Sequence, residues 1–321
     1  LIGCGRSGWR WRMNLLNSTG LFRRLAWGAK IGTCLQHVGI QMTTVAGLRE
    51  QHESTLKSIA HPGFESELVK ATFDNLLVEG PLCFNNFAYA LRELLRHFFH
   101  RLGSDESVRN CVWYIPNPTS KNGVTRAHRA KYMIQGGLSD NFVQRRLLVD
   151  VLSVCADLTK AFNVLNSFTH IGPSTFALKS EEVVANAAQC LAATKYLIEK
   201  ISECRRRVLD GLGNAIDQHL LNKVLSETFN ELDELATHHL IDEVHVDSVV
   251  VVDISPNDLT IEIDGGVGVE LQYGSASDVR NGIGAVMFDS FQFTASMCVA
   301  FKRSLGSDVT IFDIKIDTRD W

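Results

Sequence analysis

The sequence predicts an α+β protein in which an N-terminal helical bundle is followed by a C-terminal antiparallel β domain of about five strands. Apolar residues recur with a helical period of about 3.6 through residues 42–241, and with a strand period of about 2 after residue 242. Clusters of glycine, proline, asparagine and aspartate separate the strand segments, which favours short antiparallel connections. We therefore expect a helical domain at 42–241 and a β domain at 242–321.

The composition narrows the classes of function. With 321 residues, 45% hydrophobic and 21% charged, the chain is long enough for two ordinary globular domains. A net charge of −4 gives no overall attraction to nucleic acid, so any such contact needs a local basic patch. The sequence has no run of 18 apolar residues, and its eight cysteines lack metal-binding spacing. We expect no membrane contact, no zinc site and a reducing, cytoplasmic location.

Residues 1–41 differ from the rest of the chain. No acidic residue occurs in 1–48, while six basic residues precede Met42: Arg6, Arg10, Arg12, Arg23, Arg24 and Lys30. Arg-rich, acid-poor stretches are typical of targeting segments. The composition changes sharply at Met42, and so we interpret 1–41 as an atypical basic extension that is disordered or lies outside the native coding sequence. We assign no function to it.

The helical elements follow from periodicity and from start and stop residues. Gly63, Gly80 and Gly103 mark boundaries, and Ser139 and Ser180 are candidate N-caps. The predicted helices span 44–59, 63–80, 82–102, 125–135, 139–169, 180–209 and 214–241.

The strands are predicted from alternation of apolar and polar residues. They span 243–254, 259–263, 266–273, 291–302 and 308–316, and a long glycine-containing segment, 274–289, joins the third to the fourth.

The helix at 82–102 carries the first candidate site, in the stretch LRELLRHFFH. Arg92 and His97 are suited to metal-independent RNA cleavage, because imidazole transfers protons and guanidinium stabilises phosphorane charge. On an ideal helix these two lie about 140° apart, so they converge only at a helix end or across a dimer. Arg96 and His100, four residues apart, share a face. Alternatively, the cations form a solvated rim paired with acids such as Glu93.

A second basic cluster contains Arg126, His128, Arg129 and Lys131. Together with Arg145 and Arg146 it could bind phosphates beside the first helix. The alternative is that Arg145 and Arg146 form the polar face of their own helix.

A third candidate lies in the β region. Glu270, Asp278 and Asp289 could hold a divalent metal for DNA cleavage. However, Gln272 stands where a restriction-type nuclease has its lysine. The glycine-rich segment 274–289 could instead shape a ligand-binding or partner-binding rim.

Three stretches together resemble a known family. They are FNNFAYALRELLRHFFHRLGSDESVRNCVWY (84–114), RAKYMIQGGLSDNFV (129–143) and VELQYGSASDVRNGIGAVMFDSFQF (269–293). With the helices between them, they are similar to the bacterial predicted pPIWI-associating nucleases, over about residues 63–320. The most distinctive pieces are KYMIQGG and LQYGSASD. The resemblance implies a nuclease of a bacterial antiviral defence system, acting with a partner protein of that system.

The helix at 82–102 also resembles the R-x4-H helix of HEPN ribonucleases, which commonly act as dimers. It departs from their usual form because Glu93 follows Arg92, where asparagine is frequent.

Our leading hypothesis is therefore a defence-associated, metal-independent endoribonuclease that needs no cofactor. Its expected catalytic residues are Arg92, Arg96, His97 and His100, and its expected nucleic-acid-binding residues are Arg126, Arg129, Lys131 and Arg145. RNA is favoured over DNA, and a homodimer would bring Arg92 and His97 together. One alternative is a non-catalytic sensor or adaptor that binds a ligand or partner through the β domain. Another is a metal-dependent DNA nuclease that uses Glu270, Asp278 and Asp289.

Overall fold

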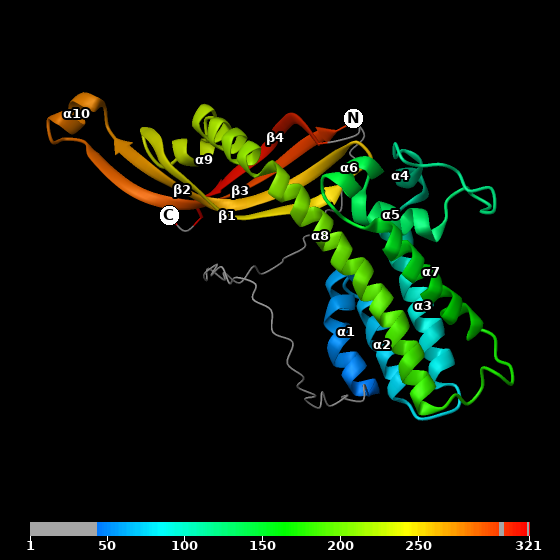
Figure 1. Ribbon diagram of the computed structural model, residues 1–321. Helices are drawn as coiled ribbons and strands as arrows, with labels where there is room; N and C mark the ends of the chain where they lie inside the picture. Colours follow the sequence, from blue (N-terminus) through cyan, green and yellow to red (C-terminus); the bar gives the residue numbers. More distant parts are fainter. Residues whose placement is uncertain (1–43, 302–304, 320) are drawn as a thin grey trace, which may run out of the picture.

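The computed structural model describes residues 44–301, 305–319 and 321. Its helices precede an antiparallel sheet, so the predicted α+β class and the helix-then-sheet order are confirmed. Figure 1 shows a helical bundle from which the sheet projects to one side. The expected extension at 1–41 lies outside the described residues.

The bundle forms around an apolar core to which α3 contributes most of the large aromatic side chains. Phe84, Phe87, Phe98 and Phe99 of α3 are almost fully buried, and they pack with Phe73 of α2. The helices of this part of the chain are α1 (Val45–Ile59), α2 (Phe64–Leu77), α3 (Cys83–Leu102), α4 (Asp105–Arg109), α5 (Arg126–Gln135), α6 (Asp140–Arg145) and α7 (Val151–Ser167). The predicted helix at 82–102 is thus confirmed.

The prediction of a single long helix at 139–169 was wrong, because residues 146–150, between α6 and α7, are not helical. Each helix has its own N-cap: Ser139 Oγ accepts from Phe142 N, and Asp150 Oδ1 accepts from Ser153 N at 3.1 Å. Between them Leu148 takes a positive φ of 53°, which an α-helix does not allow. The leucine periodicity predicted one continuous helix, but α6 ends at Arg145 and a new helix begins at the Asp150 cap.

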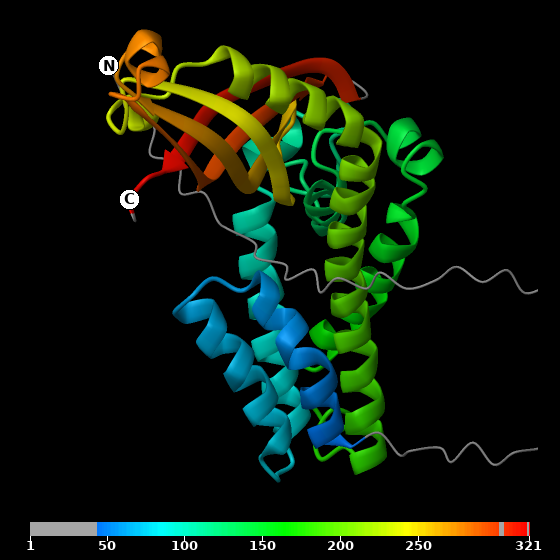
Figure 2. The ribbon, with the colours of Figure 1, turned by 90° about the vertical axis from the view of Figure 1, so that its left-hand side faces the viewer.

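The helices expected at 180–209 and 214–241 were also wrong in their bounds: one helix, α8 (Ser180–Ser226), covers the first and the beginning of the second, and residues 238–241 belong to a strand. Helix α8 passes through Gly211 and Gly213 because Leu212 and Ile216 continue its buried stripe. The N-terminal part of α8 packs in the bundle and its C-terminal part lies against the sheet (Figures 1 and 2). With 47 residues, α8 belongs to both parts of the molecule. The short α9 (Asn230–Asp233) follows it.

The sheet has the strand order β1-β2-β3-β4, with all neighbours antiparallel. Its strands are β1 (His238–Ile254), β2 (Asp258–Tyr273), β3 (Ala285–Phe301) and β4 (Leu305–Asp317), and α10 (Ala276–Arg280) lies in the β2–β3 connection. The segments expected at 259–263 and 266–273 form one strand. Gly265 and Gly266 do not interrupt it, because the Phe293 and His245 rings fill the space beside them.

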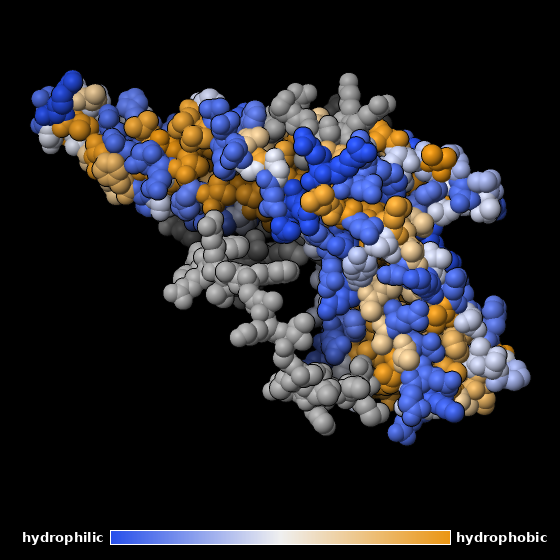
Figure 3. Space-filling view, viewed as in Figure 1, coloured by the Kyte–Doolittle hydropathy of each residue, from blue (hydrophilic) through white to orange (hydrophobic). Residues whose placement is uncertain are grey.

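One face of the sheet belongs to the core. Alternate residues of β2, such as Leu259, Ile261 and Ile263, are buried in the same cluster as Leu212 and Ile216 of α8. Figure 3 shows that hydrophobic side chains also reach the surface along the projecting sheet, where Phe288 is 69% exposed. Among the described residues, none of the helices combines the length and hydrophobicity needed to cross a membrane.

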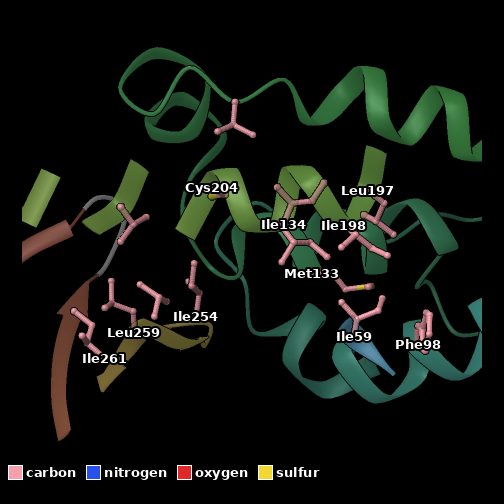
Figure 4. Packing of buried hydrophobic residues seen from close by; sticks show 14 of the residues in the cluster. Ile59, Phe98, Met133, Ile134, Leu197, Ile198, Cys204, Ile254, Leu259 and Ile261 are labelled. Atoms are coloured by element: carbon pink, nitrogen blue, oxygen red, sulfur yellow. The ribbon is translucent and has the colours of Figure 1, made fainter. Parts of the chain in front are cut away.

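The hairpin turn between β1 and β2 docks onto the end of α5. Gly137 N donates to Ser255 O at 3.0 Å, and a Cβ on Gly137 would lie 1.9 Å from Pro256 O. A Cβ on Gly136 would likewise meet Ile254 O at 2.2 Å. Ile134 and Cys204 of the helical part and Ile254 of the sheet, all labelled in Figure 4, belong to one buried cluster. The distinctive KYMIQGG segment therefore holds the bundle and the sheet together, because only glycine allows this approach.

Candidate nucleic-acid site on α3

The solvent side of α3 carries a row of polar and aromatic side chains. Tyr89, Arg92, Arg96 and His100 follow one another at spacings of three or four residues and thus share one face of the helix. The Tyr89 residue is 57% exposed and the Arg96 side chain is 53% exposed. The opposite side of α3 is buried in the aromatic core, so the fold presents this row to solvent.

Glu93 links the two arginines of the row. Arg92 Nη2 lies 3.2 Å from Glu93 Oε1, and Arg96 Nε donates to Glu93 Oε2 at 2.7 Å. The hydrogen bond from Arg96 lowers the pKa of Glu93, which is therefore ionised at neutral pH. Two guanidinium groups share one carboxylate, and the cluster keeps an excess positive charge.

His97 joins this network through Arg96. Arg96 Nη2 lies 3.4 Å from His97 Nε2, whereas Arg92 stacks its guanidinium 5.4 Å from the Tyr89 ring centroid. The structure thus brings Arg96 to His97, and turns Arg92 toward Tyr89. The His97 ring is partly exposed and meets the edge of Phe64, itself exposed, at a centroid distance of 5.0 Å. It lies outside the apolar core.

His100 lies one helical turn beyond Arg96 and is exposed. Partial desolvation, followed by the nearby cations Arg129 and Arg96, lowers the pKa of its imidazole. His100 is therefore neutral at neutral pH and can accept a proton. His97 and His100 thus both lie near Arg96. The α3 cluster, which we define as Arg92, Glu93, Arg96, His97 and His100, combines cations with proton-transfer groups.

In the second predicted basic cluster, Arg129 and Lys131 are bonded to acceptors within the protein. Arg129 is 8% exposed and donates to Gly103 O and to the Asp105 carboxylate. Lys131 Nζ donates to Asp140 at 2.7 Å and lies 4.4 Å from the Trp113 ring centroid. These partners come from other elements, so the local sequence around Arg129 and Lys131 does not reveal them.

Arg126 and Arg145 are in a different situation. Within the described part of the chain, neither has a carboxylate partner. The Arg126 guanidinium lies 4.5 Å from the centroid of the Phe162 ring of α7. Of the four predicted nucleic-acid-binding residues, Arg126 and Arg145 therefore keep an unneutralised charge.

The three carboxylates considered for a metal do not gather. Glu270 is paired with Phe288 and Asp289 with Val269 in the β2–β3 register. Neighbouring residues of a strand point to opposite faces, so Glu270 and Asp289 lie on opposite faces of the sheet. Asp278 instead caps α10, where its Oδ2 accepts from Ser275 N at 2.8 Å. Residues 44–301, 305–319 and 321 contain no cluster of three or more histidine, cysteine or carboxylate ligands suited to a metal.

Comparison with known proteins identifies the family. No curated protein and no solved structure matches the chain. Two family models, both described as "Predicted pPIWI-associating nuclease", match residues 45–194 and 201–321. The first covers the α3 cluster and the glycines that dock the β1–β2 turn, and the second covers the sheet. Because the two matches together span almost all of the described chain, the protein belongs to the predicted pPIWI-associating nuclease family.

Proposed function

We propose that this protein is an endoribonuclease that cleaves RNA at the α3 cluster without a metal ion. The observation that carries the proposal is the contact of Arg96 with both Glu93 and His97 on the solvent side of α3. A phosphodiester bound there meets a guanidinium and an imidazole together, the pair that metal-independent RNA cleavage requires.

In the proposed reaction the RNA 2′-oxygen attacks the adjacent phosphorus while neutral His100 accepts the 2′-hydroxyl proton. The bond between phosphorus and the 5′-oxygen breaks, and His97 in its protonated form donates a proton to the leaving oxygen. The products are a 2′,3′-cyclic phosphate and a 5′-hydroxyl. Arg96 stabilises the negative charge that develops on the phosphoryl oxygens. Arg92 binds a neighbouring phosphate, and Glu93 fixes the position of both guanidinium groups.

This assignment changes the role of dimerisation. Arg92 and His97 have the R-x4-H spacing of HEPN ribonucleases, but their side chains turn away from each other on α3. This pair would therefore need a second copy of the chain to converge. Arg96 and His97 already meet within one chain at 3.4 Å. We accordingly propose that the chemistry needs one subunit, and that a pPIWI protein partner in a bacterial cytoplasmic defence system recruits the nuclease to its RNA.

The test is RNA degradation by the purified protein in EDTA, compared among three variants. Arg96→Gln and His97→Gln remove the two reacting groups. The control, His219→Gln, changes an exposed histidine in the C-terminal part of α8, away from the bundle core. We expect the first two to lose about 10²–10⁴-fold in rate and His219→Gln to retain full activity. Chelator-resistant cleavage that is unchanged in His97→Gln would exclude the α3 cluster.

One observation favours a non-catalytic second candidate. The end of the sheet farthest from the bundle exposes Ile283, Met287 and Phe288, which are 80%, 47% and 69% exposed. Exposed apolar groups of this kind are typical of protein-binding surfaces. If the purified protein cleaves neither RNA nor DNA, with or without Mg²⁺, and Phe288→Ser abolishes the binding of a pPIWI partner, the adaptor function is the correct one.

A further inference from the structure

A cavity of about 360 Å³ opens between α3, α5 and α7. Phe99 lines it from α3, one helical turn after Arg96, and so the cavity and the polar face share an edge. Its volume lies in the range of about 300–1,000 Å³ that is usual for small-molecule sites. The residues that matter for its chemistry are Phe99, Asn117, Arg126, Ala127, Phe162 and Asn163.

The walls of the cavity are aromatic and its rim is polar. The Phe99 and Phe162 ring centroids lie 5.7 Å apart with the ring planes tilted by 41°, and the two rings form part of the apolar lining of the cavity. Asn117 and Asn163 add amide groups, which can both donate and accept hydrogen bonds. This combination suits a nucleobase, whose faces are apolar and whose edges carry hydrogen-bond donors and acceptors.

The charge at the cavity favours an anion. None of its lining residues is acidic, and the Arg126 guanidinium stands over Phe162 with no carboxylate partner in the described chain. The cavity also lies at the N-terminus of the ten-residue helix α5, where Thr125 Oγ1 accepts from His128 N. The N–H groups of Arg126 and Ala127 have no acceptor among the described residues. They can therefore bind a phosphate next to a base in the cavity.

We propose that this cavity receives one unstacked nucleobase of the RNA, while Arg126 holds the adjoining phosphate. The choice of RNA as the source of that nucleotide rests on the proposed function, whereas the affinity of the cavity for a nucleotide does not. The bound base positions the strand so that the next phosphodiester lies over Arg96 and His97. The cavity is thus a substrate-positioning site, and Arg126 is a positioning residue.

The experiment measures binding of the four ribonucleoside 5′-monophosphates to the whole protein by titration calorimetry, with ribose 5-phosphate as the probe that lacks a base. Ala127→Leu fills the cavity and Arg126→Gln removes its charge. Arg280→Gln is the matched control, because Arg280 is an exposed arginine of α10 at the distant end of the sheet. Thermal unfolding of each variant shows whether it is folded.

We expect at least one monophosphate to bind at least tenfold more tightly than ribose 5-phosphate. Both cavity variants should lose that binding by at least tenfold while Arg280→Gln retains it. Equal affinity for ribose 5-phosphate would overturn the proposal, since only a phosphate site would remain, and so would unchanged binding in folded Ala127→Leu. His97→Gln distinguishes this proposal from the proposed function, because the variant should bind the monophosphate normally. Nucleotide binding tests the cavity even if the protein and all of its variants cleave no RNA.

Discussion

Two basic regions of this protein look alike in sequence and differ in what their charges contact. On α3 the side chains of Arg92 and Arg96 both contact Glu93 at the surface, and Arg96 also contacts His97. In the segment 129–137, which follows the start of α5, Arg129 and Lys131 are neutralised by carboxylates from other elements. A cation that has a partner from a distant element stabilises the fold, and one that shares a single nearby acid remains available to a phosphate.

The largest effect is expected at the end of the segment 129–137. Gly137→Ala places a Cβ 1.9 Å from Pro256 O and must separate α5 from the β1–β2 turn. We predict a loss of at least about 3 kcal/mol in the free energy of unfolding, measured by urea denaturation. The control is Gly211→Ala in α8, where nothing lies within 4 Å of the new methyl group, and we expect a gain of about 0.5–1 kcal/mol there. Equal effects of the two substitutions would show that the turn does not dock as described.

The next largest effect compares the nearly buried Arg129 with the exposed Arg96. Arg129→Met leaves Asp105 Oδ1 and Gly103 O without the donor that the nearly buried Arg129 supplies, and should cost about 3 kcal/mol of unfolding free energy. Arg96→Met removes an exposed guanidinium and should cost less than about 0.5 kcal/mol. In RNA cleavage the order reverses, because folded Arg129→Met should keep its activity and Arg96→Met should lose it. A large loss of stability in Arg96→Met would contradict the distinction.

A third test compares two histidines of the bundle. His52 of α1 is 7% exposed, its Nδ1 has no hydrogen-bond partner, and burial together with Lys195 lowers its pKa. The unfolded chain therefore binds a proton more readily below pH 6.5 than the folded protein does, and stability falls as the pH is lowered from that value. We predict that His52→Leu reduces the loss in urea midpoint between pH 7.5 and pH 5.5.

His97→Gln is the control for the pH experiment, because His97 is at the surface of the same bundle. The loss in urea midpoint between pH 7.5 and pH 5.5 should be larger in His97→Gln than in His52→Leu. The measurement stays above the range in which carboxylates such as Glu65 titrate, since hydrogen bonds from Arg101 and from His61 N lower the pKa of Glu65 despite its burial. An unchanged midpoint difference in His52→Leu would show that His52 does not contribute.

The smallest effect concerns Glu93, which holds the two arginines of the α3 cluster. Glu93→Gln adds one net positive charge to this surface, and we expect RNA to bind a few-fold more tightly at low salt. Cleavage should become slower, because Arg96 Nε loses its anchor beside His97. Filter binding and single-turnover cleavage measure the two quantities separately. RNA binding that is not strengthened in Glu93→Gln would mean that RNA does not contact this face.

The sequence predicted the fold class because the two apolar periods persist over long stretches, as in α3 and in β2. Element ends were predicted less well. Gly211 and Gly213 resembled a helix end but lie inside α8, since the leucine and isoleucine stripe continues past them. Asp150, conversely, lay inside an apparently continuous helical pattern and caps a new helix.

The candidate residues were found because basic side chains on an apolar helix are conspicuous, yet their partners depend on tertiary structure. The pairing of Arg129 with Asp105 joins α5 to α4, and no local pattern encodes it. The separation of Glu270 from Asp289 follows from the β2–β3 register, which sequence spacing does not fix. The cavity beside Arg126 was missed for the same reason, because α3, α5 and α7 each supply only part of its wall.

The most direct test of the account is the chemical nature of the ends that RNA cleavage leaves in EDTA. Mass spectrometry of the fragments should find 2′,3′-cyclic phosphates and 5′-hydroxyls, and these products should disappear when a 2′-deoxynucleotide replaces the residue at the cleaved bond. Fragments with 5′-phosphate and 3′-hydroxyl ends, formed only when Mg²⁺ is present, would contradict the assignment of the reaction to Arg96 and His97.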